Sequence, residues 1–129
     1  MSDSAPTILI IDNDEGMVAA ITTRLQSIGY RCVTAGTGAQ GIAAFGEQLV
    51  DLVVTDLNMP AGDGITLARA LRAKSDVPII IVTGFHDEYR REIRSIPNVT
   101  LMEKPFDSNQ LVDLIEADLV MAGRELPVR

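Results

Sequence analysis

The chain has 129 residues, of which 47% are hydrophobic and 22% are charged, and its formal net charge at pH 7 is −7. This length and composition fit one globular domain, and no apolar stretch reaches the roughly 20 residues of a membrane span. The negative charge argues against general affinity for nucleic acid or anionic lipid. The single cysteine, Cys32, excludes an internal disulfide, and the polar start of the chain lacks the features of a signal peptide, so we expect a cytoplasmic protein.

The first part of the chain alternates apolar runs with helical patterns. Residues 7–11 form a continuous β-branched apolar run, which is typical of a strand buried on both faces. A helical pattern of apolar residues follows and stops at Gly29. A second, weaker strand is predicted over 32–35, and Thr37 can cap the next helix. The inner face of that helix is predicted to carry Ile42, Phe45 and Leu49.

The middle of the chain repeats this alternation. The third strand is predicted over 51–55, and it is followed by a loop over 58–64 that is dense in turn-forming residues. A helix comes next, and its apolar positions are expected to face the sheet. The fourth strand, 77–82, is the longest apolar run. The apolar positions of the helix between these strands are Ile65, Ala68 and Leu71.

The last part of the chain adds two helices and one strand. The segment 86–95 has only a thin apolar stripe among many charges, so we expect it to be the most loosely attached helix. The fifth strand is predicted over 99–103. Asp107 or Ser108 is expected to cap the last helix. The inner face of this helix is predicted to carry Leu111, Ile115 and Leu119.

Five alternations of strand and helix predict an α/β fold, with a doubly wound five-stranded parallel sheet and helices on both faces. We place the domain over residues 7–121, between short tails over 1–6 and 122–129. The sequence contains no internal repeat or linker that would indicate a second domain. Ligands of such sheets bind at the edge where the strands end.

Polar side chains stand where four of the five predicted strands end: Asp12, Asp56, Thr83 and Lys104. Successive members are one or two strand–helix units apart, so parallel strands bring all four to the same edge of the sheet. Two carboxylates and a main-chain carbonyl just past Asp56 suit Mg²⁺, which takes oxygen ligands and keeps several waters. An aspartate can accept a phosphoryl group as an acyl phosphate, and an ammonium and a hydroxyl can stabilise the phosphoryl oxygens.

In order, spacing and placement, these motifs resemble the receiver domain of bacterial two-component response regulators, over roughly residues 7–121. The resemblance implies a (βα)5 flavodoxin-like fold with strand order 2-1-3-4-5. The matching motifs are ILIID ending at Asp12, DLNMP beginning at Asp56, DG at Asp63, IVTG around Thr83 and KPF beginning at Lys104.

The resemblance implies that Asp56 takes a phosphoryl group from a phosphohistidine of a sensor histidine kinase or phosphotransfer protein. It also implies that Asp12 and the main-chain carbonyl of Asn58 help to hold Mg²⁺, while Thr83 and Lys104 contact the phosphoryl oxygens. The domain would be a signalling module that catalyses its own phosphorylation and dephosphorylation, not an enzyme with a separate substrate.

Further expectations concern geometry and output. The Lys104–Pro105 peptide bond is often cis in this family. Output would be altered partner binding through the face near 84–106. Members that bind DNA usually carry a second domain, so direct DNA binding by this chain is not expected. The cognate kinase, the downstream target, dimerisation, and whether the chain is a fragment of a longer protein are left open.

Two positions depart from the family pattern. The family usually has two consecutive acidic residues after the first strand, whereas here Asp12 is followed by Asn13 and then Asp14. An amide brings no charge to a metal, so we expect weaker Mg²⁺ binding, and whether Asn13 or Asp14 supplies a ligand stays open. At the second position, Leu101 replaces an aromatic that commonly swings inward in the family. We therefore expect phosphorylation to shift the loop after the fourth strand and the segment 86–95 without an aromatic flip.

Two alternative functions follow from the same residues. Asn13 also fits a receiver-like interaction module that does not accept phosphate. Asp12 and Asp14 also resemble the nucleophile and general acid of haloacid dehalogenase-like phosphatases. That family needs a further acidic pair on a strand after the lysine, whereas only a helix and a tail follow Lys104, and Asp56 would have no purpose.

Overall fold

The computed structural model describes residues 5–58, 63–84 and 86–127, and for residues 86–88 it describes the main chain alone. Within these residues, five strands alternate with five helices, which confirms the predicted α/β class. The strands are β1 (Thr7–Ile11), β2 (Arg31–Ala35), β3 (Leu52–Asp56), β4 (Ile79–Thr83) and β5 (Val99–Glu103). The helices are α1 (Glu15–Ile28), α2 (Gly38–Glu47), α3 (Gly64–Arg72), α4 (His86–Arg94) and α5 (Ser108–Met121).

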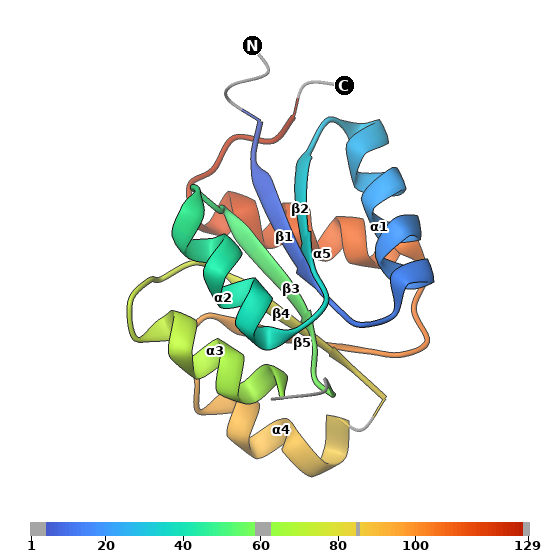
Figure 1. Cartoon of the computed structure of the whole chain (residues 1–129). Coiled ribbons are helices and arrows are strands. Elements are labelled where there is room, and N and C mark those ends of the chain that lie inside the picture. The colour runs from blue at the N-terminus through green and yellow to red at the C-terminus, as the bar shows by residue number, and fades with distance from the viewer. Residues whose placement is uncertain (1–4, 59–62, 85, 128–129) are drawn as a thin grey trace.

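The five strands form one parallel sheet in the order β2-β1-β3-β4-β5. The expected flavodoxin-like strand order is therefore confirmed. In Figure 1, α1 and α5 cover one face of the sheet, and α2, α3 and α4 cover the other. The chain changes faces between β1 and β3, which places the topological switch point at the ends of these two strands.

Every residue of the central strands β1, β3 and β4 is buried. Successive side chains of a strand point to opposite faces of the sheet. Leu9 and Ile11 therefore pack toward α2, α3 and α4, whereas Ile8 and Ile10 pack toward α1 and α5. Burial on both faces explains why these strands are continuous apolar runs in the sequence.

Side-chain caps fix where the helices begin. Thr37 accepts a hydrogen bond from the Gln40 N–H, and Asp107 accepts one from the Gln110 N–H, so both predicted caps are present. Asp107 and Gln110 form a reciprocal capping box. At the other end of α1, Gly29 has a φ of 116°, a left-handed conformation that favours glycine and ends the helix.

Two strands lie slightly later in the chain than predicted. β3 extends through Asp56, and β4 runs from Ile79 to Thr83 instead of beginning at Val77. Pro78 has no N–H to donate to a ladder, which accounts for the later start of β4. The shift makes Asp56 and Thr83 the last residues of their strands.

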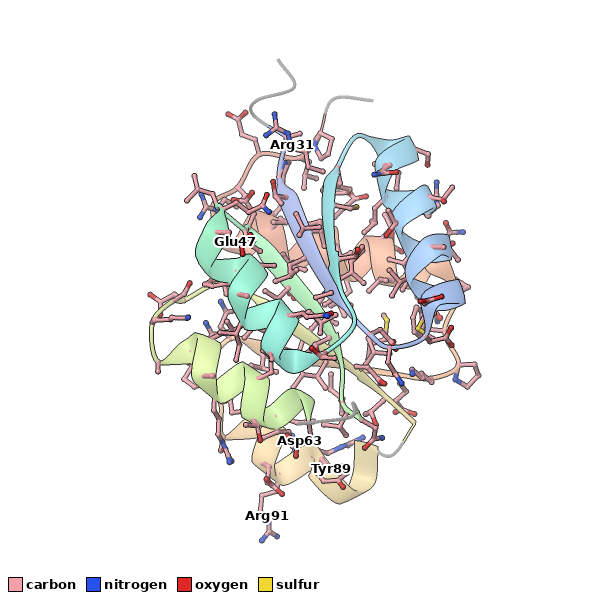
Figure 2. The ribbon with its side chains drawn as sticks, in the orientation of Figure 1. Arg31, Glu47, Asp63, Tyr89 and Arg91 are labelled. Carbon is pink, nitrogen blue, oxygen red and sulfur yellow. The ribbon has the colours of Figure 1, made fainter. Side chains whose placement is uncertain are left out.

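The prediction that Leu49 lies on the inner face of the second helix is wrong. α2 ends at Glu47, which Figure 2 labels, and the next residue, Gln48, is extended with φ −155° and ψ 166°. This break in the helical period turns Leu49 away from the core, and its side chain is 91% exposed. The two other predicted inner positions, Ile42 and Phe45, pack against the core.

Part of the predicted C-terminal tail contacts the domain. The Arg124 guanidinium Nε lies 3.4 Å from Asp51 Oδ1, and Leu126 packs against the core beneath α1 and α5. Asp51 also accepts a hydrogen bond of 2.8 Å from the Thr7 N–H. The segment 122–127 is therefore tied to the sheet edge at which β1 and β3 begin.

The predicted turn-rich loop over 58–64 is described only in part. Met59, Pro60, Ala61 and Gly62 lie outside the described residues, whereas Asp63 caps α3 by accepting a hydrogen bond of 2.7 Å from the Thr66 N–H. No helix in the described part of the chain is long and apolar enough to cross a membrane.

Arg72, at the end of α3, joins three segments of the fold. Its guanidinium donates hydrogen bonds to the carbonyls of Ser75 at 2.7 Å, Pro97 at 2.8 Å and Asn98 at 3.1 Å. Asn98 has a φ of 57° and donates its side-chain amide to the Asp76 carbonyl at 2.9 Å. These bonds hold the loop before β4 against the loop between α4 and β5.

We predict that Arg72→Met lowers the free energy of unfolding by about 1–3 kcal/mol, because three carbonyls lose a charged donor. Arg69→Met is the matched control on the same helix. Within the part of the chain that the structure describes, the contact of Arg69 is an exposed ion pair with Glu92 at 3.8 Å, so its loss should cost less than about 1 kcal/mol. Urea denaturation of both variants measures the difference, and equal losses would contradict the assignment.

Candidate functional site

Four strand ends meet at one edge of the sheet. Asp12 directly follows β1, Asp56 ends β3, Thr83 ends β4 and Lys104 directly follows β5. Asp56 lies opposite Val82 in the ladder between β3 and β4, and the Lys104 N–H donates to the Thr83 carbonyl at 2.9 Å. The parallel register thus brings to one edge the four residues that the sequence predicted there.

An ion pair links two members of this group, Asp56 and Lys104. The Lys104 ammonium Nζ lies 3.2 Å from Asp56 Oδ1, and the side chains are 30% and 9% exposed, respectively. Charge-assisted hydrogen bonds strengthen when water is partly excluded. Lys104 also lines a cleft of about 620 Å³ that Met17 and Ile21 of α1 share. Its peptide bond to Pro105 is cis, as the resemblance implied.

Asp12 is a buried carboxylate at the same edge. Its side chain accepts a hydrogen bond of 2.9 Å from the Asp14 N–H, and the residue is only 7% exposed. Burial raises the pKa of the Asp12 carboxyl, and the nearby Asp56 raises it further, while the Asp14 N–H and Lys104 act in the opposite direction. A cation bound between the two carboxylates would relieve this cost.

The two candidate ligands that follow Asp12 lie differently. Asn13 and Asp14 are both exposed. The Asp14 side chain caps α1 by accepting a hydrogen bond of 3.1 Å from the Met17 N–H. Among the described residues, no group of three or more His, Cys, Asp or Glu side chains is arranged to hold a metal.

The donor set at this edge still fits Mg²⁺. This cation takes one or two carboxylates and fills the rest of its shell with other oxygens and water. Asp12 and Asp56 would supply the carboxylates, and Asn58, an exposed residue, lies two positions beyond Asp56. Thr83 is fully buried at the end of β4, and its hydroxyl is a potential hydrogen-bond donor at the same edge of the sheet.

One contact at this edge was not anticipated from the sequence. The Thr55 hydroxyl is buried and donates a hydrogen bond of 3.0 Å to the carbonyl of Asp56. Its only sequence signal is a single hydroxyl residue inside an otherwise apolar strand, which is equally typical of a structural threonine.

Comparison with known proteins agrees with this fold. The family described as the response regulator receiver domain matches residues 8–116. The chain therefore belongs to the family of response regulator receiver domains. Among solved structures, the chemotaxis response regulator CheY4 of Vibrio cholerae has a TM-score of 0.82 at 24% identity, covering 88% of this chain and 98% of that one. The non-phosphorylated HemR receiver domain of Leptospira biflexa also has a TM-score of 0.82, at 28% identity, covering 88% of this chain and 94% of that one.

Curated relatives are longer than this chain. The probable transcriptional regulator ycf27 of Pyropia yezoensis is 37% identical over 128 residues, which is 96% of this chain and 51% of the relative. The transcriptional regulatory protein GlrR of Escherichia coli is 32% identical over 119 residues, which is 90% of this chain and 27% of the relative. The chain thus spans about half or less of the length of these relatives.

We predict that Asp12→Asn raises the free energy of unfolding of the metal-free protein by about 1 kcal/mol at pH 7. The pKa of Asp12 is higher in the folded chain than the usual 3.8, so its ionised form costs folding free energy above that folded pKa. As the pH falls through the folded pKa, the wild type gains stability and the difference should vanish near pH 3.

Urea denaturation in a chelator, across pH 3–8, measures this effect. Asp14→Asn is the control, because asparagine caps a helix as well as aspartate does and its stability should change little. A destabilised Asp12→Asn protein, or a difference that persists at pH 3, would contradict the prediction.

A second prediction concerns magnesium affinity. Asn13→Asp adds a carboxylate beside Asp12, so we expect Mg²⁺ to bind about tenfold more tightly, which corresponds to about 1.4 kcal/mol. Isothermal titration calorimetry measures the change. Asp14→Asn should leave the affinity unchanged, because Asp14 serves as the cap of α1. Loss of Mg²⁺ binding in Asp14→Asn would instead identify Asp14 as the ligand.

Proposed function

We propose that this receiver domain accepts a phosphoryl group on Asp56 as one step of a phosphorelay. The observation that carries the proposal is the Lys104 ammonium, 3.2 Å from Asp56 Oδ1, at the strand edge that also carries the buried carboxylate of Asp12. This arrangement combines a nucleophilic carboxylate with a fixed cation for the phosphoryl oxygens.

In the proposed reaction, an Asp56 carboxylate oxygen attacks the phosphorus of a phosphohistidine in line with the leaving nitrogen. The new oxygen–phosphorus bond forms as the nitrogen–phosphorus bond breaks, and the electron pair stays on the departing imidazole, which is left neutral or takes a proton from water. Lys104 holds the carboxylate in place and neutralises charge on the phosphoryl group. The Thr83 hydroxyl donates a hydrogen bond to a phosphoryl oxygen.

Mg²⁺, when bound, would supply further neutralisation of the phosphoryl oxygens. Asp12, Asp56 and the main-chain carbonyl of Asn58 would hold it. The proposed donor is a sensor histidine kinase or a phosphotransfer protein. The single cysteine, Cys32, is unbridged, which is consistent with a reducing compartment, and we place the reaction in the cytoplasm.

The proposed output is altered binding through the face near 84–106. Phosphorylation would replace the Asp56 carboxylate oxygen that Lys104 contacts with phosphoryl oxygens further from β3. Lys104 and Thr83 would follow these oxygens, and both are joined to the ends of β4 and β5. Leu101 lies opposite Ile81 and packs against the core on the face of the sheet that α4 covers. Because a leucine stands where the family commonly has an aromatic, no aromatic flip accompanies this shift. DNA binding in longer relatives belongs, in this proposal, to a part of those proteins outside the receiver domain.

The two alternatives have less support. In a phosphatase mechanism, Asp14 would act as a general acid, yet its side chain is engaged as the cap of α1. The phosphate-independent module rests on Asn13 alone, whereas Asp56, Thr83 and Lys104 retain the chemistry of phosphoryl acceptance. The matches reported above are to response regulators, receiver domains and transcriptional regulators.

We predict that incubation with acetyl phosphate and Mg²⁺ adds the mass of one phosphoryl group, as measured by intact mass spectrometry. Asp56→Asn should show no gain, because an amide does not attack phosphorus. Asp113→Asn, which changes an exposed carboxylate on α5, is the matched control and should behave like the wild type.

Two results of this phosphorylation experiment would contradict the proposed function. A mass gain in Asp56→Asn would move the acceptor to another residue. No gain in the wild type, with either acetyl phosphate or a phosphohistidine protein as donor, would support the phosphate-independent module.

A further inference from the structure

We propose that Gly64 is a positioning residue for Asp56, because the absence of a side chain there lets α3 begin directly against the main chain of the phosphoryl acceptor. The inference rests on the proposed function and extends it to a residue outside the charged pocket. The observation behind the inference is the close approach of Gly64, at the start of α3, to the main chain of Asp56 and Leu57.

The space beside Gly64 is already filled by main-chain atoms. A Cβ at this position would lie 2.5 Å from the Asp56 carbonyl oxygen, 3.0 Å from Leu57 Cα and 3.2 Å from the Asp56 carbonyl carbon. Cβ atoms essentially never approach other heavy atoms within 3.0 Å. Gly41 has an equally close neighbour at 2.5 Å, but that neighbour is Cδ1 of Ile11, the movable end of a side chain.

The main chain at Asp56 and Leu57 has little room to yield. The Thr55 hydroxyl bonds the Asp56 carbonyl at 3.0 Å, and the Leu57 N–H donates to the Val82 carbonyl of β4 at 2.9 Å. The Gly64 N–H donates to the Leu57 carbonyl at 2.7 Å. The Leu57 side chain is itself only 1% exposed. These contacts hold the segment between β4 and the first residue of α3.

Asp63 and Gly64 therefore have separate roles in the same turn. Asp63, labelled at the start of α3 in Figure 2, begins the helix by capping the Thr66 N–H. Gly64 sets how closely that helix start approaches β3. The sequence pair Asp-Gly indicated a turn, but only the packing distinguishes the cap from the position where the backbones meet.

A side chain at position 64 would change the position of the reacting carboxylate of Asp56. Ordinary contacts of a Cβ begin near 3.4 Å, so the Asp56 carbonyl would have to move by about 0.9 Å or α3 would have to withdraw. Either change alters the placement of Asp56 relative to Lys104, and it also displaces Asn58, two residues further on. Misplacement by about 1 Å can slow a positioned reaction by about 100-fold.

The test compares Gly64→Ala with two controls on the full chain. Gly46→Ala makes the same chemical change where a Cβ meets nothing within 4 Å. Ile65→Ala removes buried packing from the same turn of α3, at a residue that is 3% exposed, and keeps Gly64. The readouts are the maximal rate of phosphorylation by acetyl phosphate, its half-saturating concentration, and the urea midpoint of unfolding.

We expect Gly64→Ala to lower the maximal rate by about 10- to 100-fold with little change in half-saturation. Gly46→Ala should match the wild type. Ile65→Ala should shift the urea midpoint yet keep its rate within about twofold of the wild type. A wild-type rate in Gly64→Ala, or an equal loss of rate in Ile65→Ala, would overturn the inference.

A second pair of variants keeps the test decisive if Gly64→Ala does not fold. Thr55→Val removes the hydrogen bond from the Thr55 hydroxyl to the Asp56 carbonyl and should slow phosphorylation. Thr55→Ser keeps the hydroxyl and should retain the wild-type rate. Equal rates in Thr55→Val and the wild type would overturn the idea that this carbonyl must be held. A wild type that accepts no phosphoryl group from either donor would contradict the proposed function itself, whereas a phosphorylated wild type with unaffected variants would contradict this inference alone.

Discussion

Two buried carboxylates, Asp12 and Asp56, stand at the end of an apolar sheet, and the cost of keeping their charges away from water is the constraint on which the rest of the site depends. Lys104 compensates part of this charge through its contact of 3.2 Å with Asp56. The pKa of the Asp12 carboxyl is raised, chiefly because the carboxyl is buried, and the charge of Asp56 raises it further. This concentration of negative charge favours the binding of a divalent cation. A bound cation would also stabilise the charge that develops during phosphoryl transfer.

The fold supplies the positions for these charges. Parallel strands end at the same edge, and the switch point between β1 and β3 places Asp12 beside Asp56. The opposite edge is held by different contacts, in which Asp51 joins Thr7 to Arg124, and Arg72 fixes the loops that lead into β4 and β5. The site therefore stands on a scaffold whose remaining parts are fixed by hydrogen bonds and apolar packing.

The sequence predicted most of this arrangement because burial on both faces leaves a strong pattern. The strands around Ile10, Val54 and Ile80 are continuous apolar runs, and polar residues at their ends mark the site. Features that depend on a single turn were less predictable. The helical spacing of Leu49 predicts a core residue, but the extended backbone of Gln48 ends the helix before it. The approach of Gly64 to Asp56 joins two segments across a loop, and no local pattern reports such a distance.

The proposed function requires that Asp56, and not Asp12, forms the acyl phosphate. Borohydride reduces an acyl phosphate to an alcohol and so converts the modified aspartate to homoserine, which peptide mass spectrometry locates after phosphorylation with Mg²⁺ and acetyl phosphate. We expect homoserine at position 56 alone. Homoserine at position 12, or a phosphoryl group retained on the protein with position 56 unchanged, would contradict it.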